Sequence, residues 1–217
     1  MSGDPARDGA RGTVAKRRAM ALESLGNVAD ALGIVDFGSS IFAVTRGQWS
    51  MIDAILHVLD CCEGDCALSL WTWTVAEYEV EVLTRLRLDS RLSSGRLVID
   101  HGARQKNAGI VAEWKASFGP ASVRYVVNHA KIATISDGKG RRFLLRGSMN
   151  LNFNPRFEQF DLTEGGEDYA LVKRIEEELP FLGDDASGAA VYAASKVGSA
   201  FRAEELAMFQ GVKRWAK

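Results

Sequence analysis

Cysteine is scarce in this chain, and a long apolar run is absent. The 217 residues include three cysteines, and Cys61, Cys62 and Cys66 all lie within six residues of one another. That spacing is a poor disulfide framework for a chain of this length. No apolar run approaches the roughly 18 residues that a membrane-spanning helix needs, and the first residues do not resemble a signal peptide. These absences favour a reduced, cytoplasmic protein that has no membrane partner.

A strong net charge is also missing. The formal net charge is −1 and the isoelectric point is about 6.3, so the chain lacks the global basic field of many nucleic-acid-binding proteins. The charge is unevenly placed, however. Residues 1–18 hold five Lys or Arg against two Asp, and residues 124–146 hold six against one. The second basic segment is expected to surround the functional site, where it would suit a polyanionic substrate. A solvated hairpin tip is the alternative for Lys139, Arg141 and Arg142.

Residues 126–161 contain the most informative grouping of side chains. His129 and Lys131 interrupt an apolar run, and on a β-strand side chains two residues apart point to the same face. A Ser-Asp-Gly-Lys-Gly turn follows at residues 136–140, and a second apolar run follows at residues 143–145. Asp-Gly between two apolar runs is typical of a β-hairpin. The pattern predicts that the segment after the second run returns beside His129 and Lys131.

That returning segment carries Gly147, Ser148 and Asn150. The hairpin would therefore gather an imidazole, an ammonium, a hydroxyl and an amide at one end of a buried sheet. Imidazole acts as a nucleophile or a general acid and base near neutral pH. The ammonium, the polar side chains and the backbone N–H groups of a glycine turn can hold phosphoryl oxygens. The group could attack a phosphate ester; a buried His and an extended Lys at a strand edge are the structural alternative.

The spacing resembles the HKD signature of the phospholipase D superfamily. The matching residues are His129-Ala-Lys131, Gly147-Ser148-Met-Asn150 and the downstream Glu158. The chain departs from the signature at Asp137, which lies one residue late because Ser136 occupies the usual Asp position. We expect Asp137 to be structural rather than catalytic. The resemblance covers roughly residues 47–178 and points to the small, single-motif, bacterial endonuclease-like members.

The resemblance implies an α/β fold, with a mixed and mostly parallel β-sheet flanked by helices on both faces. It implies a metal-independent phosphodiesterase, without a cofactor, that forms a phosphohistidine. Two motifs make one active site in this family, but His57 has no Lys two residues later, and His101 is followed by Gly102 and Ala103. A homodimer in which the two copies of His129 meet across a two-fold axis is therefore expected.

Roles for individual residues also follow from the resemblance. His129 would attack phosphorus, while Lys131, Ser148 and Asn150 would bind the phosphoryl oxygens. Glu158 would orient the imidazole, because a carboxylate on one ring nitrogen fixes the tautomer. Gly147, Arg146 and Arg142 are predicted to contact the substrate. The expected substrate is nucleic acid, with DNA favoured over RNA. A degenerate DNA-binding or assembly protein is the main alternative, and lipid hydrolysis is the next.

The periodicity of the rest of the chain predicts the other elements and the domain limits. Helices are expected over residues 16–32, 51–60, 76–88, 106–118, 169–179 and 189–217, and strands over residues 37–45, 67–75, 96–100 and 122–127. Residues 1–33 would form a flexible basic arm and a helix, residues 34–180 the phospholipase-D-like domain, and residues 181–217 a linker and a helical tail.

Three smaller features have two readings each. Cys61, Cys62 and Cys66 with His57 could be proposed as zinc ligands, but their spacing fits no common zinc pattern, and buried thiols are the alternative. Trp71 and Trp73 could stack on bases, or they could pack in the core or in an interface. The acidic run at residues 176–178 is expected to be a solvated helix face.

Overall fold

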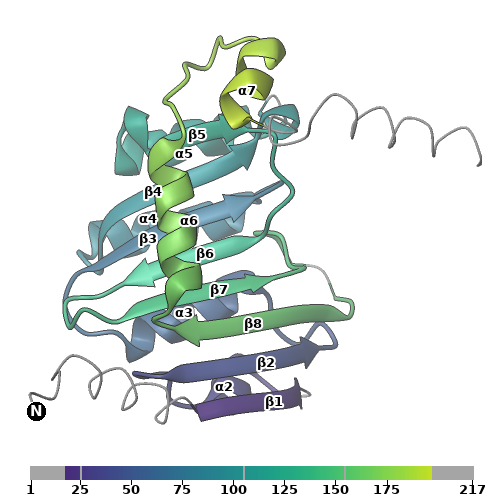
Figure 1. The fold of residues 1–217 in the computed structure, drawn as a ribbon, viewed down its shortest axis with the longest axis vertical. Coiled ribbons are helices and arrows are strands. Elements are labelled where there is room, and N and C mark those ends of the chain that lie inside the picture. Colours follow the sequence, from purple (N-terminus) through teal and green to yellow (C-terminus); the bar gives the residue numbers. More distant parts are fainter. Residues whose placement is uncertain (1–17, 25, 105, 154, 197–217) are drawn as a thin grey trace, which may run out of the picture.

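One eight-stranded sheet organises the described part of the chain. The computed structural model describes residues 18–24, 26–104, 106–153 and 155–196. The strand order is β1-β2-β8-β7-β6-β3-β4-β5 (Figure 1). The strands are β1 (Arg18–Ser24), β2 (Ser39–Thr45), β3 (Cys66–Thr72), β4 (Leu92–Asp100), β5 (Val123–Val126), β6 (Ile132–Ser136), β7 (Arg142–Gly147) and β8 (Glu158–Glu164).

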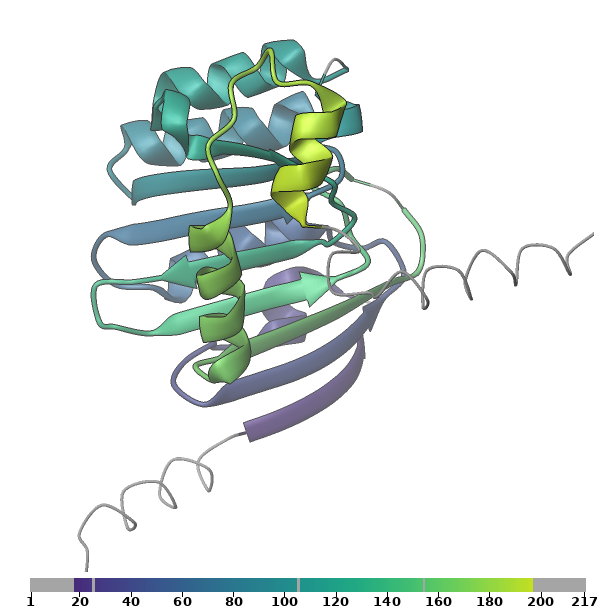
Figure 2. The same cartoon turned by 45° about the horizontal axis from the view of Figure 1, so that its top comes forward.

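Helices cover both faces of the sheet, as the sequence predicts. They are α2 (Val28–Leu32), α3 (Met51–Cys61), α4 (Glu77–Leu88), α5 (Ala108–Phe118), α6 (Glu167–Glu178) and α7 (Gly188–Ser195), with short 3-10 turns at η1 (His101–Ala103) and η2 (Pro120–Ser122). Helix α6 crosses one face, with α7 near β5 on the same side, whereas α3, α4 and α5 lie on the opposite face. Figure 2 shows the sheet between α6 and the layer formed by α4 and α5. The predicted α/β sandwich with a mixed sheet is therefore confirmed.

The predicted majority of parallel strands is wrong. The pairs β1–β2, β3–β4 and β4–β5 are parallel, but β2–β8, β3–β6, β6–β7 and β7–β8 are antiparallel. Consecutive strands β6, β7 and β8 pair directly without a crossover and therefore run antiparallel, whereas parallel neighbours need a crossover connection. Helices α4 and α5 supply such crossovers on one side of the sheet, and the β6–β7–β8 meander fills its centre.

The main core lies between the sheet and helices α3, α4 and α5. Helix α3 begins at Ser50, whose backbone N–H donates to the Asp53 carboxylate at 2.7 Å, a capping arrangement that satisfies one free amide of the first turn. Its apolar side buries Ile52, Ile55 and Leu59. These side chains lie on the face of the sheet opposite α6. They form one core with the apolar side chains of the strands and with Val80, Leu83, Val111 and Trp114.

Two expected helices differ from the structure. Where one helix was expected over residues 16–32, the described residues form strand β1 and the short helix α2. Strand β1 pairs in parallel with β2, and this partner, far outside a local window, overrides the helical pattern. In the expected helix over residues 189–217, the described part contains α7, and residues 197–217 lie outside the described residues. The domain limits remain a prediction.

No helix in the described ranges combines the length and the apolar character needed to cross a membrane.

Candidate active site

The two halves of the motif meet at one end of the sheet. Strand β6 begins at Ile132 and β7 ends at Gly147, and the antiparallel register places Ile132 opposite Arg146. The backbone N–H of Gly147 donates to the carbonyl oxygen of Lys131 at 3.2 Å. The ends of β3 and β5 and the beginning of β8 lie at the same end of the sheet (Figure 1). The predicted hairpin is confirmed, and it brings Gly147 and Ser148 back beside Lys131.

His129 and Lys131 do not share a strand face, because they precede β6 and lie in the loop after β5. The Lys131 side chain instead folds back onto His129. Its Nζ lies 2.9 Å from Nδ1 and 3.2 Å from Nε2 of the ring, and it donates to the His129 carbonyl oxygen at 2.7 Å. The ammonium therefore stands beside the imidazole, as predicted, but through a local turn rather than strand parity.

Burial sets the electrostatics of this pair. Lys131 is 8% exposed, whereas the His129 side chain is exposed. Burial lowers the pKa of Lys131 below the ordinary lysine value of 10.5; Glu158 partly opposes this shift and Arg156 adds to it. Partial desolvation strengthens the attraction between an ammonium and an anion. The site therefore offers an accessible ring next to a partly dehydrated cation.

Glu158 contacts other partners than the predicted imidazole. One of its carboxylate oxygens accepts a hydrogen bond from the Ser148 hydroxyl, and the other accepts from Arg156 Nε at 2.6 Å. The Ser148 Oγ in turn accepts from the backbone N–H of Gln159 at 3.0 Å. Within the described residues, no hydrogen bond joins Glu158 to His129. Glu158 thus fixes Ser148 and acts on Lys131 through its charge.

Gly147 and Asn150 complete the second half of the motif. A Cβ atom at Gly147 would lie 2.2 Å from the carbonyl oxygen of Gln159, so a glycine is needed where β7 approaches β8 this closely. The Oδ1 atom of Asn150 is buried, and it has no hydrogen-bond partner among the described residues. A buried polar atom without a partner costs free energy and often marks a functional position.

The two arginines predicted to contact the substrate lie in different places. Arg146 is near the site, but its guanidinium donates to Asp168 at 3.0 Å, toward α6. Arg142 pairs with Ser136 at the other end of the hairpin. Four residues of strand span about 13 Å, so the structure does not bring Arg142 to the site. The prediction that the basic segment surrounds the site is wrong for the same reason, because Lys139 and Arg141 also lie at the turn of this hairpin.

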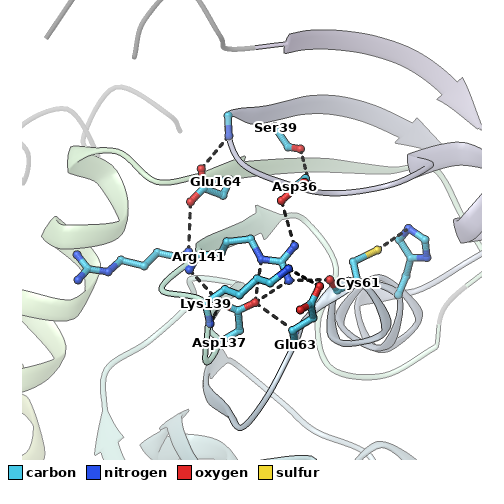
Figure 3. A network of polar contacts seen from close by, with 11 residues as sticks. Asp36, Ser39, Cys61, Glu63, Asp137, Lys139, Arg141 and Glu164 are labelled. Carbon is cyan, nitrogen blue, oxygen red and sulfur yellow. Dashed lines mark hydrogen bonds and ion pairs between the residues drawn. The ribbon is translucent and has the colours of Figure 1, made fainter. Parts of the chain in front are cut away.

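Asp137 lies at that far turn, in a buried polar network (Figure 3). Its carboxylate accepts from Arg141 Nε at 2.8 Å and from the backbone N–H of Arg141 at 2.9 Å. Arg141 also contacts Asp36 at 3.1 Å and donates to the Cys61 carbonyl oxygen at 2.8 Å. Burial alone would raise the pKa of Asp137, but hydrogen bonds from Arg141 and Glu63 outweigh it, so its pKa lies below the ordinary 3.8. These contacts support the expected structural role of Asp137.

Asn128 is a site residue that the sequence analysis missed. Its side-chain Nδ2 donates to the carbonyl oxygen of Thr72 at 3.1 Å, and its Oδ1 accepts from the backbone N–H of Ala130 at 2.9 Å. Its own backbone N–H donates to Asp100 at 2.9 Å. These bonds hold the backbone on both sides of His129. Asn preceding the His-x-Lys motif is the available sequence signal, since Asn favours such local side-chain to backbone bonds.

Replacing Asn128 by alanine is expected to lower the free energy of unfolding by about 1–3 kcal/mol, because buried backbone groups lose their partners. It should also lower kcat at temperatures where the variant is fully folded, since His129 loses its fixed position. Urea denaturation and steady-state kinetics would measure the two effects. An Asn128→Ala variant with unchanged kcat would show that the loop holds its shape without this side chain.

Glu176 corrects a second interpretation. The acidic run was expected to face solvent, and Glu177 and Glu178 are indeed exposed, but Glu176 is 1% exposed. Its carboxylate accepts from Trp71 Nε1 at 3.1 Å, from Arg96 at 2.9 Å and from Lys173 at 2.6 Å, and also from the hydroxyl of Ser69. This cluster fixes α6 to the sheet. The sequence contains a signal for the burial of Glu176, because Tyr169, Lys173 and Glu176 are spaced to lie on one face of a helix.

The other two histidines have different surroundings. His57 on α3 contacts the Gly33 carbonyl oxygen through Nε2 at 2.6 Å, and the same atom is 4.0 Å from Cys61 Sγ. His101 lies in η1, where its Nε2 is close to Gly188 at the beginning of α7. Neither ring has a lysine and a Gly-Ser-x-Asn segment beside it.

No known family model and no curated protein sequence matches this chain. A search of solved structures finds similar ones. Nuc from Salmonella typhimurium, described as a phospholipase D family member, is 18% identical over 64% of this chain and 90% of that chain, with a TM-score of 0.44. NucT from Helicobacter pylori is 13% identical over 64% and 94%, with a TM-score of 0.43. A mutant of yeast tyrosyl-DNA phosphodiesterase is 12% identical over 63% and 36%, with a TM-score of 0.33.

The solved structures that resemble this chain include a phospholipase D family member, which is the family that its His-x-Lys and Gly-Ser-x-Asn motifs resemble.

Proposed function

We propose that this chain is a metal-independent phosphodiesterase that cleaves nucleic acid through a phosphohistidine at His129. One observation supports the proposal: the Lys131 ammonium lies 2.9 Å from the His129 ring, and the backbone N–H of Gly147, the first residue of the Gly-Ser-Met-Asn segment, donates to the Lys131 carbonyl oxygen at 3.2 Å. A nucleophilic ring, a cation for the phosphoryl oxygens and polar donors thus occupy one small region. This is the arrangement that attack on a phosphodiester requires.

The proposed first step forms a bond between a His129 ring nitrogen and phosphorus. As this bond forms, the bond between phosphorus and the leaving oxygen breaks, and the leaving oxygen takes its electron pair. Lys131, Ser148 and Asn150 stabilise the charge on the two non-bridging oxygens in the transition state. An acid must protonate the leaving oxygen, since an alkoxide is a poor leaving group.

The proposed acid is His129 of a second copy of the chain. The sequence contains one motif, and a two-fold homodimer would place the second imidazole across a shared site. After the first product leaves, the same ring would accept a proton from water while the water oxygen attacks phosphorus. The phosphorus–nitrogen bond then breaks and the first histidine is restored, so atoms and protons balance over the cycle.

Replacing Lys131 by alanine is expected to lower kcat by about 10²- to 10³-fold, the usual effect of removing one donor to a developing charge. The fold should be little affected. Because burial lowers the pKa of Lys131, the ammonium loses its proton at a pH below 10.5. Activity should therefore fall along an alkaline limb below that pH, and in Lys131→Arg the limb should move to higher pH. A pH–rate profile with no difference between the wild type and Lys131→Arg would contradict this role.

Nucleic acid is proposed as the substrate because the resemblance implies it, with DNA favoured over RNA. The second candidate is a degenerate binding or assembly protein. One observation favours it: Glu158 contacts Ser148 and Arg156 rather than the imidazole, so the predicted orienting contact is missing. The predicted cytoplasmic location stays a prediction.

One panel of assays separates these functions. Plasmid DNA, single-stranded DNA, RNA and phosphatidylcholine would be incubated in EDTA with the wild type and with His129→Ala. Cleavage of nucleic acid that the substitution removes supports the proposal. Binding of nucleic acid without turnover would favour the degenerate protein, and turnover of the lipid would favour the phospholipase reading. Cleavage that EDTA abolishes would contradict metal independence.

A further inference from the structure

Trp73 stands out among the tryptophans because its side chain is exposed next to His129. Four tryptophans lie in the described residues: Trp49, Trp71, Trp73 and Trp114. Trp49 packs against Phe160, Trp114 packs against Phe118, and Trp71 donates to Glu176. Trp73 is 46% exposed, and its ring centroid lies 6.2 Å from that of His129. In the described part of the chain, its indole N–H has no hydrogen-bond partner.

The backbone around Trp73 is held from two sides. The carbonyl oxygen of Thr72 accepts from Asn128 at 3.1 Å, and its hydroxyl accepts from the backbone N–H of Leu151 at 3.2 Å. Val75 is buried and bridges to Leu151. The exposed indole thus lies on a fixed segment that contacts Asn128 and Leu151, the residues next to the two halves of the motif. Its interplanar angle to His129 is 45°, so the two rings are not stacked on each other.

We propose that Trp73 is the stacking platform for a nucleobase next to the cleaved phosphate, which makes the site selective for unpaired strands. The proposal rests on the proposed function, because it takes the phosphate to lie at His129. A base joined to that nucleotide would lie within reach of an indole one ring away. Bases of a single strand stack readily on aromatic side chains, with little dependence on which base is present.

Selectivity for unpaired strands follows from the state of the bases. In a duplex each base is stacked and paired, and turning it out costs a few kcal/mol. A single strand offers its bases freely. The basic hairpin turn with Lys139 and Arg141 lies at the other end of β6 and β7, so it adds no charge to the site near His129. Lys131 holds the phosphate of either kind of strand, whereas stacking on Trp73 is available only to an unpaired base.

The proposal is tested by measuring kcat/KM for two proteins, each on two substrates. The wild type and Trp73→Ala would each be given a fluorescent single-stranded oligonucleotide, and the same strand with abasic sites on both sides of the cleaved phosphate. Trp73→Ala is expected to lose roughly 5- to 150-fold in kcat/KM on the complete strand and little on the abasic strand. Trp73→Phe should recover most of the loss. Annealing the complementary strand should slow cleavage by the wild type. The ratio of the single-strand rate to the duplex rate should be smaller for Trp73→Ala than for the wild type.

Phe37→Ala is the matched control, since Phe37 is also an exposed aromatic, at 61%, and lies just before β2 at the opposite end of the sheet. Phe37→Ala should cleave the complete and the abasic strands at the wild-type rates. Equal losses on the complete and the abasic strands, or no loss on either, would overturn the proposal. So would conversion of a dimer into a monomer by Trp73→Ala, because the ring would then belong to a subunit interface.

The proposed function can fail separately. If the wild type cleaves no nucleic acid, the same four combinations would be measured as equilibrium binding in the His129→Asn background. Weaker binding of the complete strand by Trp73→Ala, without a change for the abasic strand, would support the stacking platform even in an inactive protein. Equal binding by both proteins would overturn it.

Discussion

His129→Ala is expected to abolish phosphodiester cleavage, with kcat falling by roughly 10⁴- to 10⁶-fold, as it does when the nucleophile of a covalent catalyst is removed. The imidazole is exposed and makes its side-chain contacts with Lys131 and Trp73, so its loss should not disturb the core. Initial rates in EDTA on a nucleic acid substrate would measure the effect. Circular dichroism and thermal unfolding would show that the fold is retained.

His57→Ala is the control for this substitution, because it removes the same side chain from helix α3, away from the site. It should retain full activity. Mixing adds a sharper test of the shared site. When the wild type exchanges subunits with an excess of His129→Ala, most wild-type chains pair with an inactive one, and the rate per wild-type chain should fall toward zero. An unchanged rate would show that each chain cleaves independently.

Breaking the pair of Asp137 and Arg141 is expected to have the largest effect on stability. The side chain of Arg141 is 5% exposed and that of Asp137 is fully buried. Arg141→Met leaves a buried carboxylate without its cation, and such losses cost about 3–5 kcal/mol. Urea denaturation would measure the change. Lys139→Ala is the matched control at the same turn, because its ion pair with Glu63 is half exposed on both sides and should contribute about 1 kcal/mol or less.

The same pair predicts a dependence on pH. Because the pKa of Asp137 is lowered in the folded state, its contribution to stability is present above the ordinary value of 3.8 and is lost as the pH falls through the lower folded value. Asp137→Asn should therefore remove part of the acid-induced loss of stability while lowering stability at neutral pH. A variant with the stability and the acid limb of the wild type would contradict the role of the pair.

Local sequence patterns were sufficient to predict much of the fold and to predict that the two halves of the motif come together. The Asp-Gly turn between two apolar runs predicted the β6–β7 hairpin, and Ser50 predicted the beginning of α3. The mixed α/β sheet followed from the resemblance. These features depend on short stretches of sequence, where turn chemistry and caps act directly.

The remaining features depend on partners far along the chain. Strand β1 forms against β2, which a helical pattern over residues 16–32 does not reveal. Glu176 is buried because Ser69 and Arg96 lie beneath α6. Counting charges over residues 124–146 could not show that Arg142 and the turn lie at the far end of the hairpin. Asn128 was missed because its acceptor, the Thr72 carbonyl oxygen, lies 56 positions away.

Trapping the covalent intermediate tests the central claim most directly. The wild type would be mixed in EDTA with an oligonucleotide labelled with ³²P at the cleaved phosphate, quenched rapidly and digested. The account predicts a label that is stable to alkali and labile to acid, as expected for a phosphorus–nitrogen bond, on the peptide that contains His129, and no label in His129→Ala. Turnover without a labelled protein, or a label that persists in His129→Ala, would contradict it.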